Sequence, residues 1–240
     1  HTYSMIHPEA DLYAHDIHFT GKSSSFKVTY EGKDYDFETR LAGRFNVYNT
    51  LGAVGACLSE GVSMETIVEG MRDFKSVPGR FELIDEGQPF TVVVDYAHTP
   101  DGLEKILTTA EEITKGRIIV VFGCGGDRDR MKRPIMGRIA ARNADIALVT
   151  SDNPRTEDPA SIVKEVAAGV EEVKKEKPSL SYEVIVDRRS AICRAIELAK
   201  PGDIVLIAGK GHENYQILKD KTIHFDDREE ARKALKLKEK

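Results

Sequence analysis

Apolar and polar positions alternate in two different ways along this chain, and the change falls near residue 78. Beyond that point, short apolar runs typical of buried strands alternate with stretches whose apolar residues recur at helical spacing. The strand-like runs are 91–96, 117–122, 146–150, 182–186 and 203–208, and the helical stretches are 100–115, 134–143, 159–174 and 189–198. This alternation predicts an α/β fold with βαβ units and a doubly wound, mostly parallel sheet. A hairpin at 215–225 and a charged helix from Asp226 are expected to complete it.

The residues before this region follow another pattern. Residues 14–40 alternate apolar and polar positions around a turn at 31–34, which predicts short antiparallel strands. A helical pattern follows at 45–60, and Ser63 is suited to cap a second helix. Val77-Pro78-Gly79 then interrupts the chain. We therefore expect one domain, or part of one, at residues 1–77 and a second domain at residues 78–240.

Composition excludes several classes of protein. Of the 240 residues, 40% are apolar and 31% are charged, and the formal net charge is −5 without any basic run, so nucleic acid and anionic membranes are poor partners. No stretch approaches the ~18–20 apolar residues that span a bilayer. Three widely spaced cysteines (Cys57, Cys124 and Cys193) form neither a disulfide framework nor a zinc pattern, which fits a reducing cytoplasm. The sequence opens at His1 and runs directly into strand-like sequence, so we expect a piece of a longer protein.

Polar and glycine-rich segments follow four of the predicted strands of the second region. They are residues 95–98, 123–130, 151–158 and 209–213. Open α/β sheets bind ligands at the carboxyl ends of their strands. We therefore expect these four loops to converge on one rim and to form a ligand site there.

The first glycine-rich loop suggests an anion site. Residues 123–128 read Gly-Cys-Gly-Gly-Asp-Arg, which fails the dinucleotide fingerprint because Arg128 stands where its third glycine is required. The glycines still allow backbone N–H groups to approach an anion, and Arg128 adds a forked donor. A tight strand–helix turn with a solvated arginine is the alternative.

Two further loops carry the charges that an amino-acid zwitterion requires. In Asp152-Asn153-Pro154-Arg155, the proline fixes the backbone, Arg155 can bind a carboxylate through two parallel hydrogen bonds, and Asp152 can accept from an ammonium group. In Gly209-Lys210-Gly211-His212-Glu213, the glycines permit close approach and Glu213 can accept from a second ammonium. An Asx-turn and a mobile turn with an exposed glutamate are the respective alternatives. His98, soon after Asp95, contacts a nucleotide or simply caps the next helix.

Two segments imitate a phosphate-binding P-loop without meeting its pattern. Gly21-Lys22-Ser23 has Asp16 where the earlier glycine is required, and it lies between two predicted strands instead of opening a helix. Gly209-Lys210-Gly211 lacks the following serine or threonine. Neither segment is therefore predicted to cradle phosphates.

Six segments together resemble the Mur ligases, and within them the branch that adds meso-diaminopimelate. They are GRFNVYN (43–49), VPGRFE (77–82), VDYAHTPD (94–101), FGCGGDRDRMKRP (122–134), TSDNPRTEDP (150–159) and AGKGHE (208–213), in the order found in the family. Lysine-adding relatives generally differ at the DNPR segment, which is intact here. The first 40 residues are similar to the preceding strands of the family's central domain.

The resemblance implies a domain organisation. The family has an N-terminal domain that binds the UDP end, a central ATPase domain and a Rossmann-like C-terminal domain that binds the incoming amino acid. Residues 1–77 would be the tail of the central domain, and residues 78–240 the C-terminal domain. The P-loop, the magnesium-binding residues, the carbamylated lysine and the UDP-sugar contacts would lie outside this chain. We therefore expect the chain alone to be inactive and to hold no metal site.

The resemblance also implies a reaction and its residues. The full-length protein would be a cytoplasmic, monomeric ligase of peptidoglycan precursor synthesis that uses ATP and Mg²⁺. It would join meso-diaminopimelate to UDP-N-acetylmuramoyl-L-alanyl-D-glutamate through an acyl phosphate. Nucleotide contacts are implied at Asn46, Asn49, Arg80, Asp95 and His98, with Arg80 and Asp95 catalytic. Meso-diaminopimelate contacts are implied at Arg128, Asp152, Asn153, Pro154, Arg155, Gly209 and Glu213, with Arg155 a buried guanidinium on the distal carboxylate.

Other functions compete with this one. A folylpolyglutamate synthetase would pair similar domains, but the DNPR and GKGHE segments argue against it. A nicotinamide-dependent dehydrogenase is excluded mainly by the failed glycine fingerprint. An isolated amino-acid-binding module without catalysis remains the non-enzymatic alternative.

Overall fold

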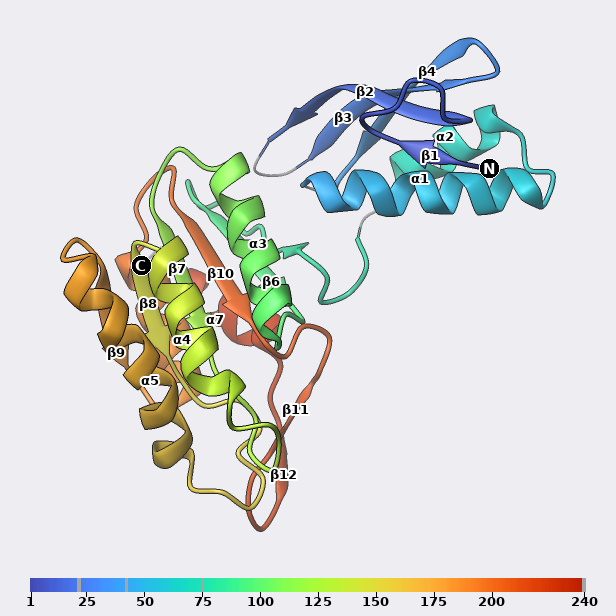
Figure 1. Cartoon of the computed structure of the whole chain (residues 1–240). Helices are drawn as coiled ribbons and strands as arrows, with labels where there is room; N and C mark the ends of the chain where they lie inside the picture. The colour runs from blue at the N-terminus through green and yellow to red at the C-terminus, as the bar shows by residue number, and fades with distance from the viewer. Residues whose placement is uncertain (21–22, 42, 75, 239–240) are drawn as a thin grey trace. The chain divides into compact units, whose positions relative to one another are not determined.

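The computed structural model describes residues 1–20, 23–41, 43–74 and 76–238, and Figure 1 traces them from blue to red. Gly21 and Lys22 of the P-loop-like segment lie outside the described residues. The chain divides into two compact units, His1–Ser76 and Val77–Lys240. Each unit has its own core and is described by itself.

The first unit packs two helices on a four-stranded sheet. The strands β1 (Tyr3–Ser4), β2 (Leu12–Phe19), β3 (Ser24–Tyr30) and β4 (Lys33–Thr39) lie in that order, with β2, β3 and β4 antiparallel as predicted. The helices are α1 (Arg44–Ser59) and α2 (Met64–Asp73). Alternate residues of the strands, such as Phe26 and Val28, are buried against Leu51 of α1. The predicted cap is confirmed, since Ser63 accepts a hydrogen bond from the N–H of Thr66.

The second unit is a three-layer α/β structure. Its strands are β5 (Glu82–Leu83), β6 (Thr91–Asp95), β7 (Ile118–Phe122), β8 (Ile146–Val149), β9 (Ser181–Val184) and β10 (Ile204–Ala208). Its helices are α3 (Pro100–Ile113), α4 (Lys132–Asn143), α5 (Pro159–Glu176), α6 (Arg188–Leu198) and α7 (Asp227–Lys238). A separate hairpin joins β11 (Tyr215–Ile217) to β12 (Thr222–His224). The predicted strand–helix alternation is confirmed throughout.

The order of strands in the sheet is β5-β6-β10-β7-β8-β9. All neighbours pair in parallel except β5, which is antiparallel to β6 at one edge. From β6 the chain proceeds across the sheet through β7 and β8 to β9. It then crosses back, and β10 pairs between β6 and β7. Because crossovers keep one hand, the helices of the outward path and of the return path cover opposite faces. Accordingly α3, α4 and α5 pack in a row in front of the sheet in Figure 1, whereas α6 and α7 pack on each other.

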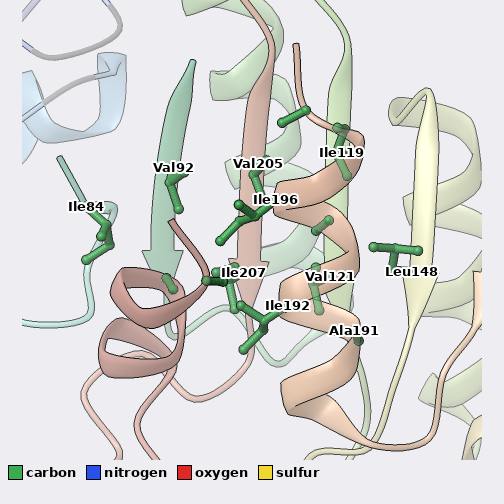
Figure 2. Close-up of a cluster of buried hydrophobic side chains, with 14 of the residues drawn as sticks. Ile84, Val92, Ile119, Val121, Leu148, Ala191, Ile192, Ile196, Val205 and Ile207 are labelled. Carbon is green, nitrogen blue, oxygen red and sulfur yellow. The ribbon is translucent and has the colours of Figure 1, made fainter. Parts of the chain in front are cut away.

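A cluster of buried apolar side chains fills the space between the sheet and the helices α6 and α7 (Figure 2). Val92, Ile119 and Val205, from three neighbouring strands, are fully buried against Ile192 and Ile196 of α6. Strands buried on both faces read as continuous apolar runs instead of alternating ones, which is why the sequence showed such runs here. This rigid platform fixes the carboxyl ends of β6, β7, β8 and β10.

The described residues contain no helix that is both long and apolar enough to cross a bilayer.

Candidate functional site

The loops that follow β6, β10, β7 and β8 meet at the carboxyl-terminal end of the sheet. Their strands are neighbours and parallel, so their carboxyl ends lie side by side. A cavity of about 290 Å³ lies there, and its lining is drawn from all four loops: Tyr96, His98, Thr99, Gly125, Arg128, Asp129, Lys132, Asp152, Asn153, Arg155, Gly209 and Glu213. The predicted convergence on one rim is confirmed. Arg80, Asp95 and Pro154 do not line this cavity.

The two central loops are packed directly on each other. The N–H of Gly126 donates to the carbonyl of Asn153 at 2.9 Å. A Cβ on Gly126 would lie 1.9 Å from the carbonyl oxygen of Pro154, so only glycine allows this approach. Pro154 is buried and thus acts through the backbone, by shaping the loop that carries its neighbours. The glycines of the first loop therefore serve this close contact between the loops.

Two guanidinium groups line the cavity, those of Arg155 and Arg128. Arg155 has a φ of 53°, a strained conformation for a residue with a Cβ, and such strain is often found at functional sites. Its Nη1 donates to the carbonyl of Gly126 at 2.9 Å, which holds the guanidinium at the cavity wall. Arg155 is only partly buried, so the expectation of a buried guanidinium is wrong. Arg128, on the neighbouring loop, is exposed and donates to the carbonyl of Asp127 at 3.0 Å. Two guanidinium groups in one cavity suit a carboxylate ligand.

A second part of the lining, its acidic wall, is formed by two carboxylates. Asp152 and Glu213 both line it, and their side chains are 8% and 16% exposed. Asn153 joins them, because its Nδ2 donates to Oε2 of Glu213 at 3.0 Å. Gly209 has a φ of 126°, and a Cβ there would lie 2.6 Å from Oδ2 of Asp152. The glycine therefore lets that carboxylate approach the backbone. Two carboxylates close together suit an ammonium ligand.

Lys210, next to this cavity, is a residue for which no role was predicted from the sequence. Its side chain is fully buried, and its Nζ lies 3.0 Å from Oδ1 of Asn153, 3.4 Å from Oε2 of Glu213 and 3.7 Å from Oδ1 of Asp152. A lysine between two glycines after a strand carries no local signal that it is buried. Its burial follows from the tertiary structure.

The segment that contains Arg80 packs beside this cavity through Tyr96. The guanidinium of Arg80 lies 4.7 Å from the centroid of the Tyr96 ring, a cation–π distance. Asp95 is buried, and its two oxygens each accept a backbone N–H, from Phe81 and from Ala97, both at 2.7 Å. Burial raises the pKa of Asp95, against the effect of these two hydrogen bonds. Asp95 thus holds the backbone next to Arg80.

His98 lies at the rim as expected. Its Nδ1 donates to the carbonyl of Tyr96 at 2.8 Å, and its ring contacts the Tyr96 ring edge-on with centroids 4.6 Å apart. The helix that follows is capped by Thr99, whose side chain accepts from the N–H of Gly102. The simple capping role considered for His98 therefore belongs to Thr99.

The remaining nucleotide candidates lie in the first unit, on α1. Asn46 is buried and Asn49, one turn later, is exposed. The Nδ2 of Asn49 donates to Oδ1 of Asn46 at 3.3 Å, so the two amides share one face of the helix.

A buried ion pair beneath the rim was also missed by the sequence analysis. Arg188 and Asp227 are both fully buried and form two hydrogen bonds, of 2.8 and 2.7 Å. Arg188 also donates to the carbonyl of Ala208 at 3.0 Å and to that of Ser151 at 3.4 Å. The pair thus joins the ends of β8 and β10, immediately before the two acidic segments.

The part of the chain that the structure describes holds no group of three or more His, Cys, Asp or Glu side chains arranged for a metal ion.

Comparison with known proteins identifies the family. Residues 79–211 match the Mur ligase glutamate ligase domain, and residues 1–57 match the Mur ligase middle domain. The chain belongs to the Mur ligase family. The two matched regions fall within the two compact units of the structure.

Curated relatives carry one recurring name, UDP-N-acetylmuramoyl-L-alanyl-D-glutamate–2,6-diaminopimelate ligase. One from Clostridium botulinum is 49% identical over 96% of this chain and 47% of its own length, and one from Geobacillus kaustophilus is 50% identical over 98% and 47%. A solved structure with the same name is 38% identical, with a TM-score of 0.75, over 100% of this chain and 48% of the other. The chain therefore spans about half the length of the relatives it matches.

The fold is shared more widely. A folylpolyglutamate synthase from Thermotoga maritima superimposes with a TM-score of 0.63 at 21% identity, over 83% of this chain and 44% of the other. At that identity the match concerns the fold alone. It shows that the α/β architecture does not by itself select the substrate.

Proposed function

We propose that this chain supplies the amino-acid site of an ATP-dependent ligase that adds meso-diaminopimelate to UDP-N-acetylmuramoyl-L-alanyl-D-glutamate. The observation that carries the proposal is a single cavity whose lining brings together the guanidinium groups of Arg128 and Arg155 and the carboxylates of Asp152 and Glu213. Relatives at 49% and 50% identity bear the name of this ligase, which supports the choice of substrate.

The charges of the cavity complement one end of meso-diaminopimelate. This substrate carries a zwitterion at each end, and the distal one must be held while the other amine stays free to react. Arg128 and Arg155 would bind the distal carboxylate, and Asp152, Glu213 and the carbonyl of Gly209 would accept from the distal ammonium. L-Lysine has no distal carboxylate and would leave the guanidinium groups unpaired.

The proposed reaction forms an amide in two steps. Transfer of the γ-phosphoryl group of ATP to the peptide carboxylate gives an acyl phosphate and ADP. The free amine of diaminopimelate then attacks the acyl carbon, phosphate leaves, and the amine loses a proton. Mg²⁺ would neutralise phosphate charge, but the described residues of this chain offer no cluster to bind it.

Within this chain, five residues are proposed to form the nucleotide site. Arg80 is exposed and would stabilise the charge of the transferred phosphoryl group, with Asp95 holding its backbone. His98 and the pair Asn46 and Asn49 would contact the nucleotide directly. We place the protein in the cytoplasm, which its free cysteines suit, with small molecules as its partners.

Product analysis in the full-length protein tests this function. The protein is incubated with Mg-ATP, UDP-N-acetylmuramoyl-L-alanyl-D-glutamate and an equimolar mixture of meso-diaminopimelate, L-lysine and L-glutamate. Mass spectrometry is expected to find the diaminopimelate tripeptide as the dominant product, together with ADP. A dominant lysine or glutamate adduct, or no ATP-dependent product, would overturn the proposal.

A further inference from the structure

Lys210 places a buried positive charge directly behind the acidic wall of the cavity. It is the middle residue of the Gly209–Gly211 turn and is 0% exposed. Its Nζ reaches three acceptors, which belong to Asn153, Glu213 and Asp152. A charge in such a position is strongly unfavourable unless it is paired, so these contacts hold the lysine and their own side chains in one arrangement.

The first consequence concerns the amide of Asn153. Its Oδ1 accepts from Nζ of Lys210 and also from the N–H of Ile217, both at 3.0 Å. A rotated amide would turn its NH₂ group toward two donors, so only one orientation is allowed. In that orientation Nδ2 faces Oε2 of Glu213, which it bonds at 3.0 Å. Lys210 therefore fixes Glu213 both directly and through Asn153.

The second consequence concerns the other oxygen of Glu213. Within the described residues, the side-chain contacts of this carboxylate are made to Oε2. Oε1 thus keeps the capacity to accept from a ligand at the cavity that Glu213 lines. A carboxylate held by one oxygen presents its other oxygen in a fixed direction. The side chain therefore loses less conformational entropy when a ligand binds.

The third consequence is a charge balance. Asp152 and Glu213 together carry two negative charges, and Lys210 carries one positive charge beside them. The acidic wall is left with a net charge of minus one. Without Lys210 the two like charges would repel each other, so the lysine also keeps both carboxylates together where an ammonium group would bind.

We propose that Lys210 is a positioning residue that sets the selectivity of this site for a ligand with a distal ammonium group. This inference rests on the proposed function. It adds a residue that does not touch the substrate but holds two side chains that do.

Comparison of two substrates tests the proposal in the full-length protein. Meso-diaminopimelate is compared with 2-aminopimelate, which has the same chain and distal carboxylate but no distal ammonium. We expect the wild type to prefer diaminopimelate in kcat/KM on the order of 10²-fold, because 2-aminopimelate leaves the acidic wall unpaired. Lys210→Met is expected to lower kcat/KM for diaminopimelate by about 10²-fold and that for 2-aminopimelate by no more than about 3-fold, with the KM for ATP unchanged. The selectivity then disappears.

A matched substitution controls for the loss of a lysine. Lys177 donates to the carbonyls of Ala144 and Arg142 at 2.8 and 3.1 Å. These residues precede β8 and β9, at the amino-terminal end of the sheet. Lys177→Met should leave the ratio of the two substrates unchanged. If Lys210→Met does not fold, as judged by circular dichroism, Lys210→Gln keeps a donor without the charge and is expected to lose the same selectivity.

The outcomes separate the two hypotheses. A wild-type protein that uses neither substrate refutes the proposed function. A selective wild type whose selectivity survives in the Lys210 variant refutes the inference alone. An equal loss with both substrates also refutes it, because a merely structural lysine would affect them alike.

Discussion

The buried pair of Arg188 and Asp227 offers a direct test of how the site is supported. Both side chains are 0% exposed and make paired hydrogen bonds of 2.8 and 2.7 Å. Asp227→Asn keeps the size of the side chain but removes its charge, so the guanidinium stays buried without a counter-ion. We therefore predict a large loss of stability from a substitution that leaves the core unchanged.

The magnitude follows from this burial. Removing one partner of a buried ion pair costs ~3–5 kcal/mol, far more than the pair contributes relative to an apolar replacement. With a urea m-value of about 2 kcal/mol/M for a domain of this size, the unfolding midpoint should fall by roughly 1.5–2.5 M. Replacement of both partners, by Arg188→Met with Asp227→Leu, should recover most of that loss because no charge remains buried.

Urea unfolding followed by circular dichroism measures this effect, since the chain has no tryptophan to report by fluorescence. The matched control is Glu183→Gln, which removes the partner of Arg194 from a pair whose side chains are 34% and 41% exposed. Exposed pairs contribute at most about 1 kcal/mol. If Asp227→Asn shifts the midpoint no more than Glu183→Gln does, Arg188 is not held in place by the charge of Asp227.

Three further substitutions test other parts of the account. Arg80→Ala in the full-length protein should lower kcat by ~10²–10³-fold, as expected for a lost stabiliser of phosphoryl charge, and an unchanged kcat would make Arg80 structural. The guanidinium of Arg133 lowers the pKa of Glu157 from 4.5 to about 2. The ionised Glu157 therefore stabilises the fold above pH 4.5, and this contribution is lost as the pH falls toward 2. An acid titration followed by circular dichroism should therefore show less pH dependence between those values in Glu157→Gln, and an identical curve would contradict this. Gly126→Ala should destabilise the protein by ~1–3 kcal/mol and raise the KM for diaminopimelate, because the added Cβ would clash with the carbonyl of Pro154. Stability and KM values equal to those of the wild type would refute the packing argument.

Most helices and strands of this fold are predictable from local patterns in the sequence. Strands buried on both faces are recognised by their continuous apolar runs, and caps such as Ser63 by residue type, so the alternating elements were predicted correctly. The strands β1 and β5 were missed because each has only two residues, too few to show a period. The place of β10 between β6 and β7 is set by tertiary pairing and has no signal in the linear order.

The site was predictable to the level of its loops. The rule that parallel strands present ligands at their carboxyl ends brought together Arg128, Asp152, Arg155 and Glu213, and the cavity confirms that they meet. The partners of these side chains were not predictable. Lys210 is separated from Asn153 by 57 residues, so its role appears only when the two loops are placed together.

The central claim, that the two walls of the cavity hold the distal zwitterion of diaminopimelate, is tested most directly at Arg155. The measurement is the ratio of kcat/KM for meso-diaminopimelate to that for L-lysine, in the full-length wild type and in Arg155→Ala. Loss of a guanidinium paired with a carboxylate should lower the ratio strongly from a wild-type value of ~10⁴, with the KM for ATP barely changed. Arg155→Lys should restore little, because a point charge cannot reproduce the forked geometry. A wild type that uses lysine comparably well, or a ratio that Arg155→Ala leaves unchanged, would contradict the account.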